Sequence, residues 1–170
     1  VVATYTVPLF GGKLDMSLVG NFNKITVDDD LNIPQLLKDA KQDTIYFSPS
    51  EKGLIERVNP RAKGNFTLNY QISNFNIMIR NTYFGQVYRN AFPFGVEQTF
   101  GGKVVTDISL AYDLSDNLTF TVGANNILDV FPDPQAYFNS YFGVFKYAPV
   151  QMGTNGAFYF ARLNFRLAGK

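Results

Sequence analysis

The side chains that most enzymes use for acid, base or nucleophilic chemistry are scarce in this chain. Its 170 residues include no cysteine and no histidine. Without cysteine there is no thiolate nucleophile, no disulfide framework and no zinc finger. Without histidine the usual general base near neutral pH and the commonest metal ligand are missing as well. The composition therefore argues against triad hydrolases and metalloenzymes, and we expect no catalytic, metal-binding or cofactor-binding residue.

Asp107 and Asp113 are the acidic pair whose spacing invites comparison with a glycosidase. They stand in one alternating run, so both side chains point to one face of an expected strand, about 20 Å apart by strand rise. The carboxyl pairs of glycosidases lie within about 10 Å of each other. We therefore predict that the two aspartates face a polar interior instead. There they are expected to pair with Arg80, Arg162 or Arg166.

A short acidic run superficially resembles a calcium-binding loop. Residues 28–32 carry three aspartates and an asparagine, and Asp39 stands at the twelfth position. The glycine that such a loop needs is Ile33, a proline follows it, and the closing glutamate is replaced by the shorter aspartate. We therefore predict a solvated acidic loop without calcium. Because proline suits the first turn of a helix, a short helix is expected over 34–40.

Aromatic residues are the unusual part of the composition. The chain has 17 phenylalanines and 10 tyrosines, while charged residues make up only 17% of it. The net charge is +1 and there is no basic run, so nucleic acid is not an expected partner. No stretch approaches the 18 or so apolar residues of a membrane-spanning helix. A search for long apolar stretches cannot detect a transmembrane β-barrel, because its strands alternate lipid-facing and lumen-facing residues.

Apolar and polar residues alternate with a period of two in seven runs, which predicts seven β-strands. In the run 63–72, for example, the even positions carry Phe66 and Leu68 while the odd ones are polar. Only Ser73 and Asn74 separate this run from the next, as in a tight hairpin. The seven predicted strands cover residues 1–7, 14–23, 63–72, 75–83, 107–113, 118–125 and 157–167.

Short and long connections alternate between these strands. The short ones cover residues 8–12, 73–74 and 115–117, and the long ones cover 28–60, 88–102 and 129–155. Long loops count against a compact soluble domain, but outer-membrane barrels combine short periplasmic turns with long extracellular loops. The pattern predicts an all-β fold, an antiparallel meander that forms part of a transmembrane barrel wall, with strands pairing in chain order.

The odd number of strands indicates that this barrel is incomplete. A bacterial single-chain barrel has an even number of strands and both termini on the periplasmic side. With the short turns in the periplasm, the last strand descends to a periplasmic end, whereas Val1 starts at the extracellular rim. We expect residues 1–170 to be a single incomplete domain, the C-terminal segment of a larger barrel.

The run 117–132 resembles the penultimate-strand signature of the TonB-dependent outer-membrane receptors. In that family an alternating strand is followed by Asn-Leu-Phe-Asp and then by an aromatic-proline pair. Ile127 and Leu128 stand here where Leu and Phe are commoner. The signature residues are Asn125, Asn126, Ile127, Leu128, Asp129 and Pro132. Residues 156–165 resemble the family's terminal strand and 59–63 the start of an earlier one, so the resemblance covers essentially the whole chain.

The resemblance implies a 22-stranded barrel in the outer membrane of a Gram-negative bacterium, of which this chain supplies the last seven strands. An N-terminal plug domain, absent here, would fill the barrel, and TonB would act on it from the periplasm. The implied function is uptake of a scarce nutrient, namely an iron chelate, cobalamin, a sugar or a metal complex. Further implied partners are membrane lipid, the remaining strands and the barrel-assembly machinery. Polar lumen-facing residues would also contact the plug.

The terminal strand of the family usually ends on an aromatic residue that the assembly machinery recognises. This chain continues past Phe165 through Leu167 to Lys170. Either Phe165 or Leu167 is therefore expected to take the terminal role. The residues assigned to the terminal assembly strand are Phe158, Phe160, Phe165 and Leu167.

Two alternatives remain open from the sequence. A soluble β-sandwich that binds carbohydrate or protein would show the same alternation, with one strand face packed on a second sheet. A cluster of aromatic residues in the last long connection serves either loop packing, which we favour, or a ligand-binding surface. Its members are Phe131, Tyr137, Phe138, Tyr141, Phe142, Phe145 and Tyr147.

Overall fold

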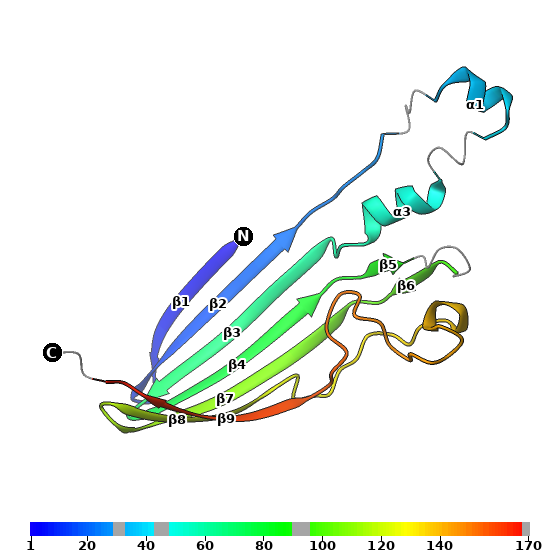
Figure 1. Cartoon of the computed structure of the whole chain (residues 1–170). Coiled ribbons are helices and arrows are strands. Elements are labelled where there is room, and N and C mark those ends of the chain that lie inside the picture. The colour runs from blue at the N-terminus through cyan, green and yellow to red at the C-terminus, as the bar shows by residue number, and fades with distance from the viewer. Residues whose placement is uncertain (29–32, 43–47, 90–95, 168–170) are drawn as a thin grey trace.

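The computed structural model describes residues 1–28, 33–42, 48–89 and 96–167. Their main element is one antiparallel sheet with the order β1-β2-β3-β4-β7-β8-β9 (Figure 1). Its strands are β1 (Val2–Leu9), β2 (Gly12–Phe22), β3 (Ala62–Ile72), β4 (Phe75–Phe84), β7 (Lys103–Ser115), β8 (Leu118–Asn125) and β9 (Phe158–Phe165). The prediction of one antiparallel meander with pairing in chain order is confirmed.

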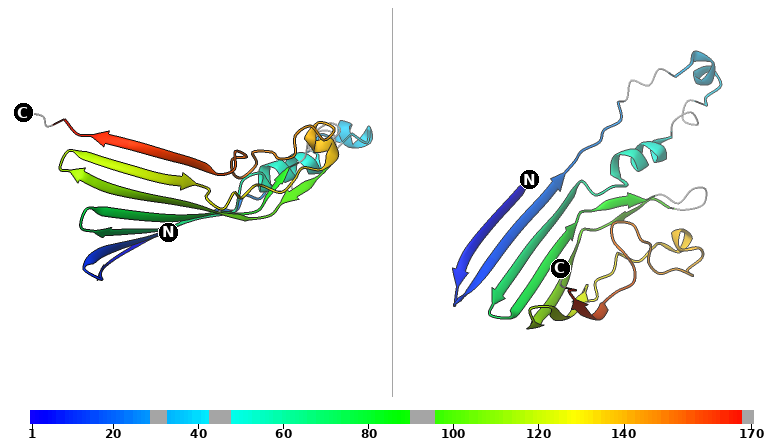
Figure 2. Two further views of the ribbon diagram at one scale, coloured as in Figure 1. Left: turned by 90° about the horizontal axis from the view of Figure 1, so that it is seen from below. Right: turned by 60° about the vertical axis from the view of Figure 1, so that its left-hand side comes forward.

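The other helices and strands of the described residues lie in the long connections. They are α1 (Gln35–Asp39), α3 (Pro49–Arg57), the ribbon of β5 (Val87–Arg89) with β6 (Gln98–Phe100), and the 3-10 turn η1 (Tyr137–Ser140). Helix α1 lies within the predicted range 34–40, whereas α3 and the β5–β6 ribbon were not predicted. None of the described helices is long and apolar enough to cross a membrane. Figure 2 shows the long connections gathered at one end of the sheet and the tight turns at the other.

The first hairpin turns later than the sequence suggested. Pro8 was expected to begin the turn, but β1 continues to Leu9 and the turn consists of Phe10 and Gly11, both with positive φ. Two central residues with positive φ are typical of the tightest hairpin loops. Reciprocal hydrogen bonds join Val1 and Gly20, so by alternation the nitrogen of Pro8 points away from β2. The missing N–H of proline therefore costs no bond between the two strands.

The strand register gathers the alternating residues into an apolar face and a polar face. Direct partners of antiparallel strands share a face, and one apolar row crosses all seven strands. It runs through Tyr5, Met16, Leu68, Ile79, Ile108, Ala124 and Tyr159. The neighbouring polar row contains Thr4, Ser17, Thr67, Arg80 and Asp107. The sheet thus has a continuous apolar surface that belongs to no compact core.

The most deeply buried hydrophobic side chains lie at the loop end instead. Of the described residues, Val87, Tyr88, Phe100 and Ala148 are at most 4% exposed, and Ala124 is the one such residue of the large sheet. Large apolar side chains of the sheet such as Leu18 and Leu163 are more than half exposed. The long connections therefore form a small packed unit, while the sheet leaves its apolar face uncovered.

Candidate functional site at the loop end of the sheet

The signature residues form a hydrogen-bonded turn that ends β8. Asn126 is buried and adopts a left-handed conformation with φ of 51°, which asparagine tolerates better than most residues. Its side-chain amide donates to Val130 O at 2.8 Å, and its Oδ1 accepts the Val130 N–H at 2.9 Å. The side chain of Asn126 therefore closes the turn in both directions.

This turn also joins three strands. Asp107 of β7 accepts the backbone N–H of Asn126 at 2.9 Å, and Ile127 N–H donates to Thr106 O at 2.8 Å. Asp129, also left-handed with φ of 54°, accepts the N–H of Ala157 at 2.9 Å, immediately before β9. Asn126 and Asp129 are thus structural members of the signature.

The other signature residues make different contributions. Asn125 is the last residue of β8, and Pro132 is buried in the chain that leaves the turn. Leu128 is 68% exposed, so its side chain contributes little packing within the described residues. The sequence identified these positions by resemblance, but it did not show which of them make the hydrogen bonds.

The five residues expected to face a polar interior are arranged differently from the predicted ion pairs. Arg80 lies directly opposite Asp107 on the polar face, while Asp113 accepts a hydrogen bond from the Thr119 hydroxyl at 2.6 Å. The Arg162 guanidinium lies 5.7 Å from the Phe160 ring centroid. Arg166 follows the end of β9. In the described part of the chain, no ion pair joins either aspartate to these arginines.

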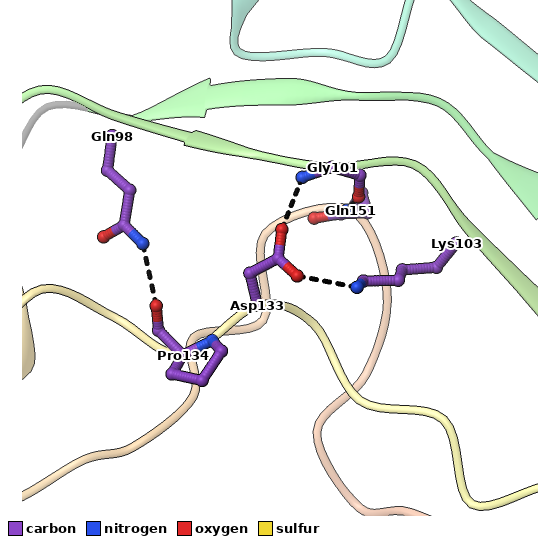
Figure 3. A network of polar contacts seen from close by, with 6 residues as sticks. All are labelled: Gln98, Gly101, Lys103, Asp133, Pro134 and Gln151. Atoms are coloured by element: carbon purple, nitrogen blue, oxygen red, sulfur yellow. Dashed lines mark hydrogen bonds and ion pairs between the residues drawn. The ribbon is translucent and has the colours of Figure 1, made fainter.

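A second group of polar contacts fastens the last long connection to β6 and β7 (Figure 3). The carboxylate of Asp133 accepts from Lys103 Nζ and from the Gly101 N–H, each at 2.6 Å. The hydrogen bond from Lys103, followed by the one from the Gly101 N–H, holds the pKa of Asp133 below its ordinary value. Asp133 is therefore ionised at neutral pH and carries the strongest polar contact between these segments.

Three amide side chains extend this fastening. Gln98 Nε2 donates to Pro134 O at 2.8 Å, and Gln151 Nε2 donates to Gly101 O at 2.6 Å (Figure 3). Asn139 exchanges hydrogen bonds with both backbone groups of Val96, at 2.9 and 2.8 Å. The connection from β8 to β9 is thus held on the β5–β6 ribbon at several points.

A pocket of about 310 Å³ lies where α3 meets β5 and the ends of β3 and β4. It contains two cationic side chains, Arg57 and Arg61, and the Arg57 guanidinium lies 4.1 Å from the Tyr88 ring centroid. The Tyr88 hydroxyl is buried and makes no hydrogen bond within the described residues. Burial and, secondarily, the nearby Glu97 carboxylate raise the pKa of Tyr88, although Glu97 does not reach hydrogen-bonding geometry. The pocket can offer two guanidinium groups to a ligand, whereas the Tyr88 hydroxyl is buried beneath its surface. Its lining residues are Arg57, Asn59, Arg61, Ala62, Tyr83, Gly85, Gln86, Val87, Tyr88 and Thr99.

The predicted aromatic cluster divides into two parts. Phe131 and Tyr147 stack with ring centroids 4.8 Å apart, as loop packing requires. Tyr141 and Phe142 are 71% and 65% exposed and follow each other in left-handed conformations that bulky residues rarely adopt. Residues in this conformation store backbone strain, which persists only where the surrounding structure holds it. The exposed members of the cluster are Tyr137, Phe138, Tyr141, Phe142 and Phe145.

Helix α3 was missed although the sequence carries its start signal. The Ser48 hydroxyl accepts the Glu51 N–H at 3.2 Å, and the Glu51 carboxylate accepts the Ser48 N–H at 2.7 Å. This reciprocal pair is a capping box, and Pro49 occupies the first turn.

Of the predicted acidic loop, Asp29, Asp30 and Asn32 lie outside the described residues, as do the last three residues of the chain.

Comparison with known proteins identifies the fold. No family model matches the sequence, and no curated protein matches it. Two solved structures match with a TM-score of 0.54 and 16% identity over 95% of this chain. Both are the ferric enterobactin receptor PfeA from Pseudomonas aeruginosa in complex with enterobactin, one as the Q482A mutant and one as the R480A mutant.

This chain has the fold of a receptor-barrel segment. The resemblance stated from the sequence is therefore confirmed at the level of the fold. The chain spans about a fifth of the receptor that it matches, since 21% of that chain is covered. The described sheet is open and is not a closed barrel. The β5–β6 ribbon lies beyond the strand ends and not over the apolar face, so the sandwich alternative is not favoured (Figure 1).

Proposed function

We propose that the chain is the C-terminal part of an outer-membrane receptor that imports a small nutrient into a Gram-negative bacterium. The observation that carries this proposal is the apolar row that crosses all seven strands without a covering layer. A water-soluble monomer rarely exposes an apolar patch larger than a few hundred Å². A barrel wall instead presents such a face to lipid.

The proposed orientation follows from the two ends of the sheet. The apolar face meets lipid and the polar face meets the barrel lumen. The tight turns face the periplasm and the long connections face the outside, as in bacterial outer-membrane barrels. The remaining strands of a 22-stranded barrel, the plug and the TonB-contacting segment would come from the rest of the protein, as the family resemblance implies.

We further propose that the nutrient is an anionic iron chelate. The matched receptor was solved with enterobactin. In this chain Arg57 and Arg61 line one pocket. Guanidinium groups form short, charge-assisted hydrogen bonds with anionic oxygens. The pocket lies among the long connections, where a ligand arriving from outside would meet it first.

Uptake by cells that produce the full-length receptor tests this function. Cells carrying it should grow on a ferric chelate as sole iron source, and cells lacking it should not. The variant R57A/R61A should weaken binding of radiolabelled chelate about tenfold or more, since each lost charge-assisted bond is worth about 1.4 kcal/mol or more. Lys13→Ala, at the turn end of the sheet, is the matched control and should bind as the unmodified protein does. Uptake of a neutral sugar or of cobalamin instead would overturn the iron assignment but not the receptor proposal.

A further inference from the structure

The register of the last strand cannot be fixed by a tight turn. In the hairpins β1–β2, β3–β4 and β7–β8 the connection itself sets which residues face each other. Strands β8 and β9, in contrast, are joined by the long connection 126–157. The length of this loop imposes no register by itself, because its closure entropy changes little when one strand slides past the other by two residues.

The alternation of β9 does not fix its register either. A slip by one residue would expose every apolar side chain on the wrong face, but a slip by two restores the pattern. After such a slip Val122 would face Leu163 instead of Ala161, and both arrangements place apolar residues together. Some other interaction must therefore distinguish the observed register from the slipped ones.

The first such interaction lies at the start of β9. Asp129 accepts the Ala157 N–H at 2.9 Å, one residue before the strand begins. The neighbouring Gly156 has φ of 68°, and a Cβ on it would lie 2.8 Å from Cζ of Phe131. Because Asp129 belongs to the turn held by Asn126, the first residues of β9 are tied to the end of β8.

The second interaction lies inside the sheet. Phe160 of β9 is directly opposite Gly123 of β8, and its ring occupies the space that a side chain at position 123 would fill. A Cβ on Gly123 would lie 2.6 Å from Cζ of Phe160 and 2.6 Å from the carbonyl oxygen of Ile108. A slip by two residues would place this ring against Thr121 or Asn125, where a side chain is in the way.

Rings also cover glycines in the other two strand pairs that long connections join. The Tyr70 ring of β3 lies against Gly12 of β2, and the Tyr83 ring of β4 lies against Gly102 next to β7. These two strand pairs are joined by the connections 23–61 and 85–102. For the glycines that the structure describes, none of the three turn-joined pairs carries such a contact. Among neighbouring strands of the large sheet, ring-on-glycine contacts between the described residues thus occur in the pairs whose connection leaves the register open.

We propose that Asp129 and Phe160 are positioning residues that fix the register of β9 on β8. Asp129 sets where β9 begins, and Phe160 admits only the register in which a glycine faces its ring. In a closed barrel the last strand also carries the stagger on which closure depends. The same two contacts would then determine whether the two ends of the barrel wall meet in register.

Disulfide cross-linking in the full-length protein can read this register directly. These 170 residues contain no cysteine, so introduced pairs report without interference from within the segment. The pair V122C/A161C reports the observed register, because these residues are direct partners and alternate with the bonded pair Asn117 and Arg166. Their Cα atoms are expected about 4.5 Å apart, within the range that a disulfide spans. The pair V122C/L163C reports a slip by two residues.

Each pair is placed in the unmodified protein and in the variants Asp129→Gly and Phe160→Leu, singly and together. Glycine removes the carboxylate while keeping the positive φ free of strain. In the double variant the ratio of observed-register to slipped cross-link should fall at least fivefold among folded, heat-modifiable molecules. The controls Asp129→Asn, which keeps an acceptor oxygen, and Tyr159→Leu, which removes a ring on the other face, should leave the ratio unchanged.

An unchanged ratio in the double variant would overturn the proposal. If the double variant leaves no folded protein, the single variants are read in the same way, and unchanged ratios in both overturn it too. An equal fall in the Tyr159→Leu control would also overturn it, because loss of any ring would then suffice. Uptake is not measured in this test, so its result is independent of the proposed nutrient.

Discussion

Arg80 and Asp107 face each other directly across β4 and β7, yet the carboxylate of Asp107 accepts the backbone N–H of Asn126. An aspartate opposite an arginine invites the assignment of an ion pair. Here the acidic side chain instead satisfies a backbone donor that the end of β8 would otherwise leave open. Asp107 therefore belongs to the turn that follows β8 as much as to its own strand.

Removing the acceptor at position 107 should loosen that turn. Asp107→Ala leaves the part-buried N–H of Asn126 without a partner and should lower the stability of the full-length protein by about 1–3 kcal/mol. Asp107→Asn keeps a side-chain oxygen and should lose less. The temperature at which the heat-modifiable band disappears measures both. Equal melting of the alanine variant and the unmodified protein would contradict this role.

Arginine placed on the apolar face should damage assembly much more than arginine on the polar face. If Leu68, Ile79 and Leu110 meet lipid, an arginine at any of them should cost about 2–4 kcal/mol near mid-membrane and less toward the rims. The same applies to Phe120. The measurements are surface abundance and heat-modifiable migration of the full-length protein.

The pairing of the strands shows which residue of the polar face is the best control for these arginine substitutions. Thr67 and Thr121 lie on the polar face, but they are directly opposite Arg80 and Arg162, so a new arginine there adds like-charge repulsion. Ser109 faces Met78 and Gly123, which carry no charge. Ser109→Arg should therefore assemble almost normally. If Ser109→Arg damages assembly and the arginine substitutions on the apolar face do not, the two faces are assigned the wrong way round.

Acid should release the last long connection from β6 and β7. Because the pKa of Asp133 is lowered in the folded protein, its contribution is complete above the ordinary value of 3.8 and is lost as the pH falls through the lowered value. Asp133→Asn should remove this pH dependence and cost at most about 1 kcal/mol, since both side chains of the ion pair are partly exposed. Cleavage within 130–156 by a protease that is active in acid, followed as the pH is lowered from neutral to well below 3.8, checks both statements. The prediction fails if cleavage of the unmodified protein does not rise over that range.

Alanine should be tolerated at one glycine and rejected at another. A Cβ at position 123 would lie 2.6 Å from the backbone oxygen of Ile108, which cannot move without disturbing β7. Gly123→Ala should therefore cost about 1–3 kcal/mol, as overpacking does elsewhere. Gly153→Ala is the matched control, because nothing lies within 4 Å of its Cβ. Similar melting temperatures for the two variants would contradict the close contact.

The sheet could be predicted from the sequence because its determinants are local. Period-two alternation and the tight turn at Ser73 and Asn74 specify strands and hairpins without reference to the rest of the chain. The face assignment followed directly, since every direct partner in the row through Leu68 and Ile79 is apolar or aromatic.

The loop-end unit could not be predicted in the same way because its contacts join distant segments. Asp133 contacts Lys103 across 30 residues of sequence, and Gln151 contacts Gly101 across 50. No periodic pattern in the sequence predicts these contacts. Each strand of the β5–β6 ribbon has only three residues, which is too few to recognise an alternation of apolar and polar residues. Helix α3 is different, because Ser48 and Glu51 form a capping box that the sequence already displayed.

Phe100 and Val87 are buried at the loop end, whereas the apolar face of the sheet is uncovered. If that face meets lipid as proposed, the two parts of the chain depend on different solvents, water for the loop end and lipid for the sheet. The loop-end unit is stabilised by removal of hydrocarbon from water, a force that urea weakens and cooling diminishes. If the wall stands in lipid as proposed, its apolar side chains are kept from water by the bilayer, and its strands are held by hydrogen bonds that have no competing water around them. Urea should therefore loosen the loop-end unit at concentrations that leave the wall intact, so in the proposed receptor the long connections can melt while the sheet stays folded.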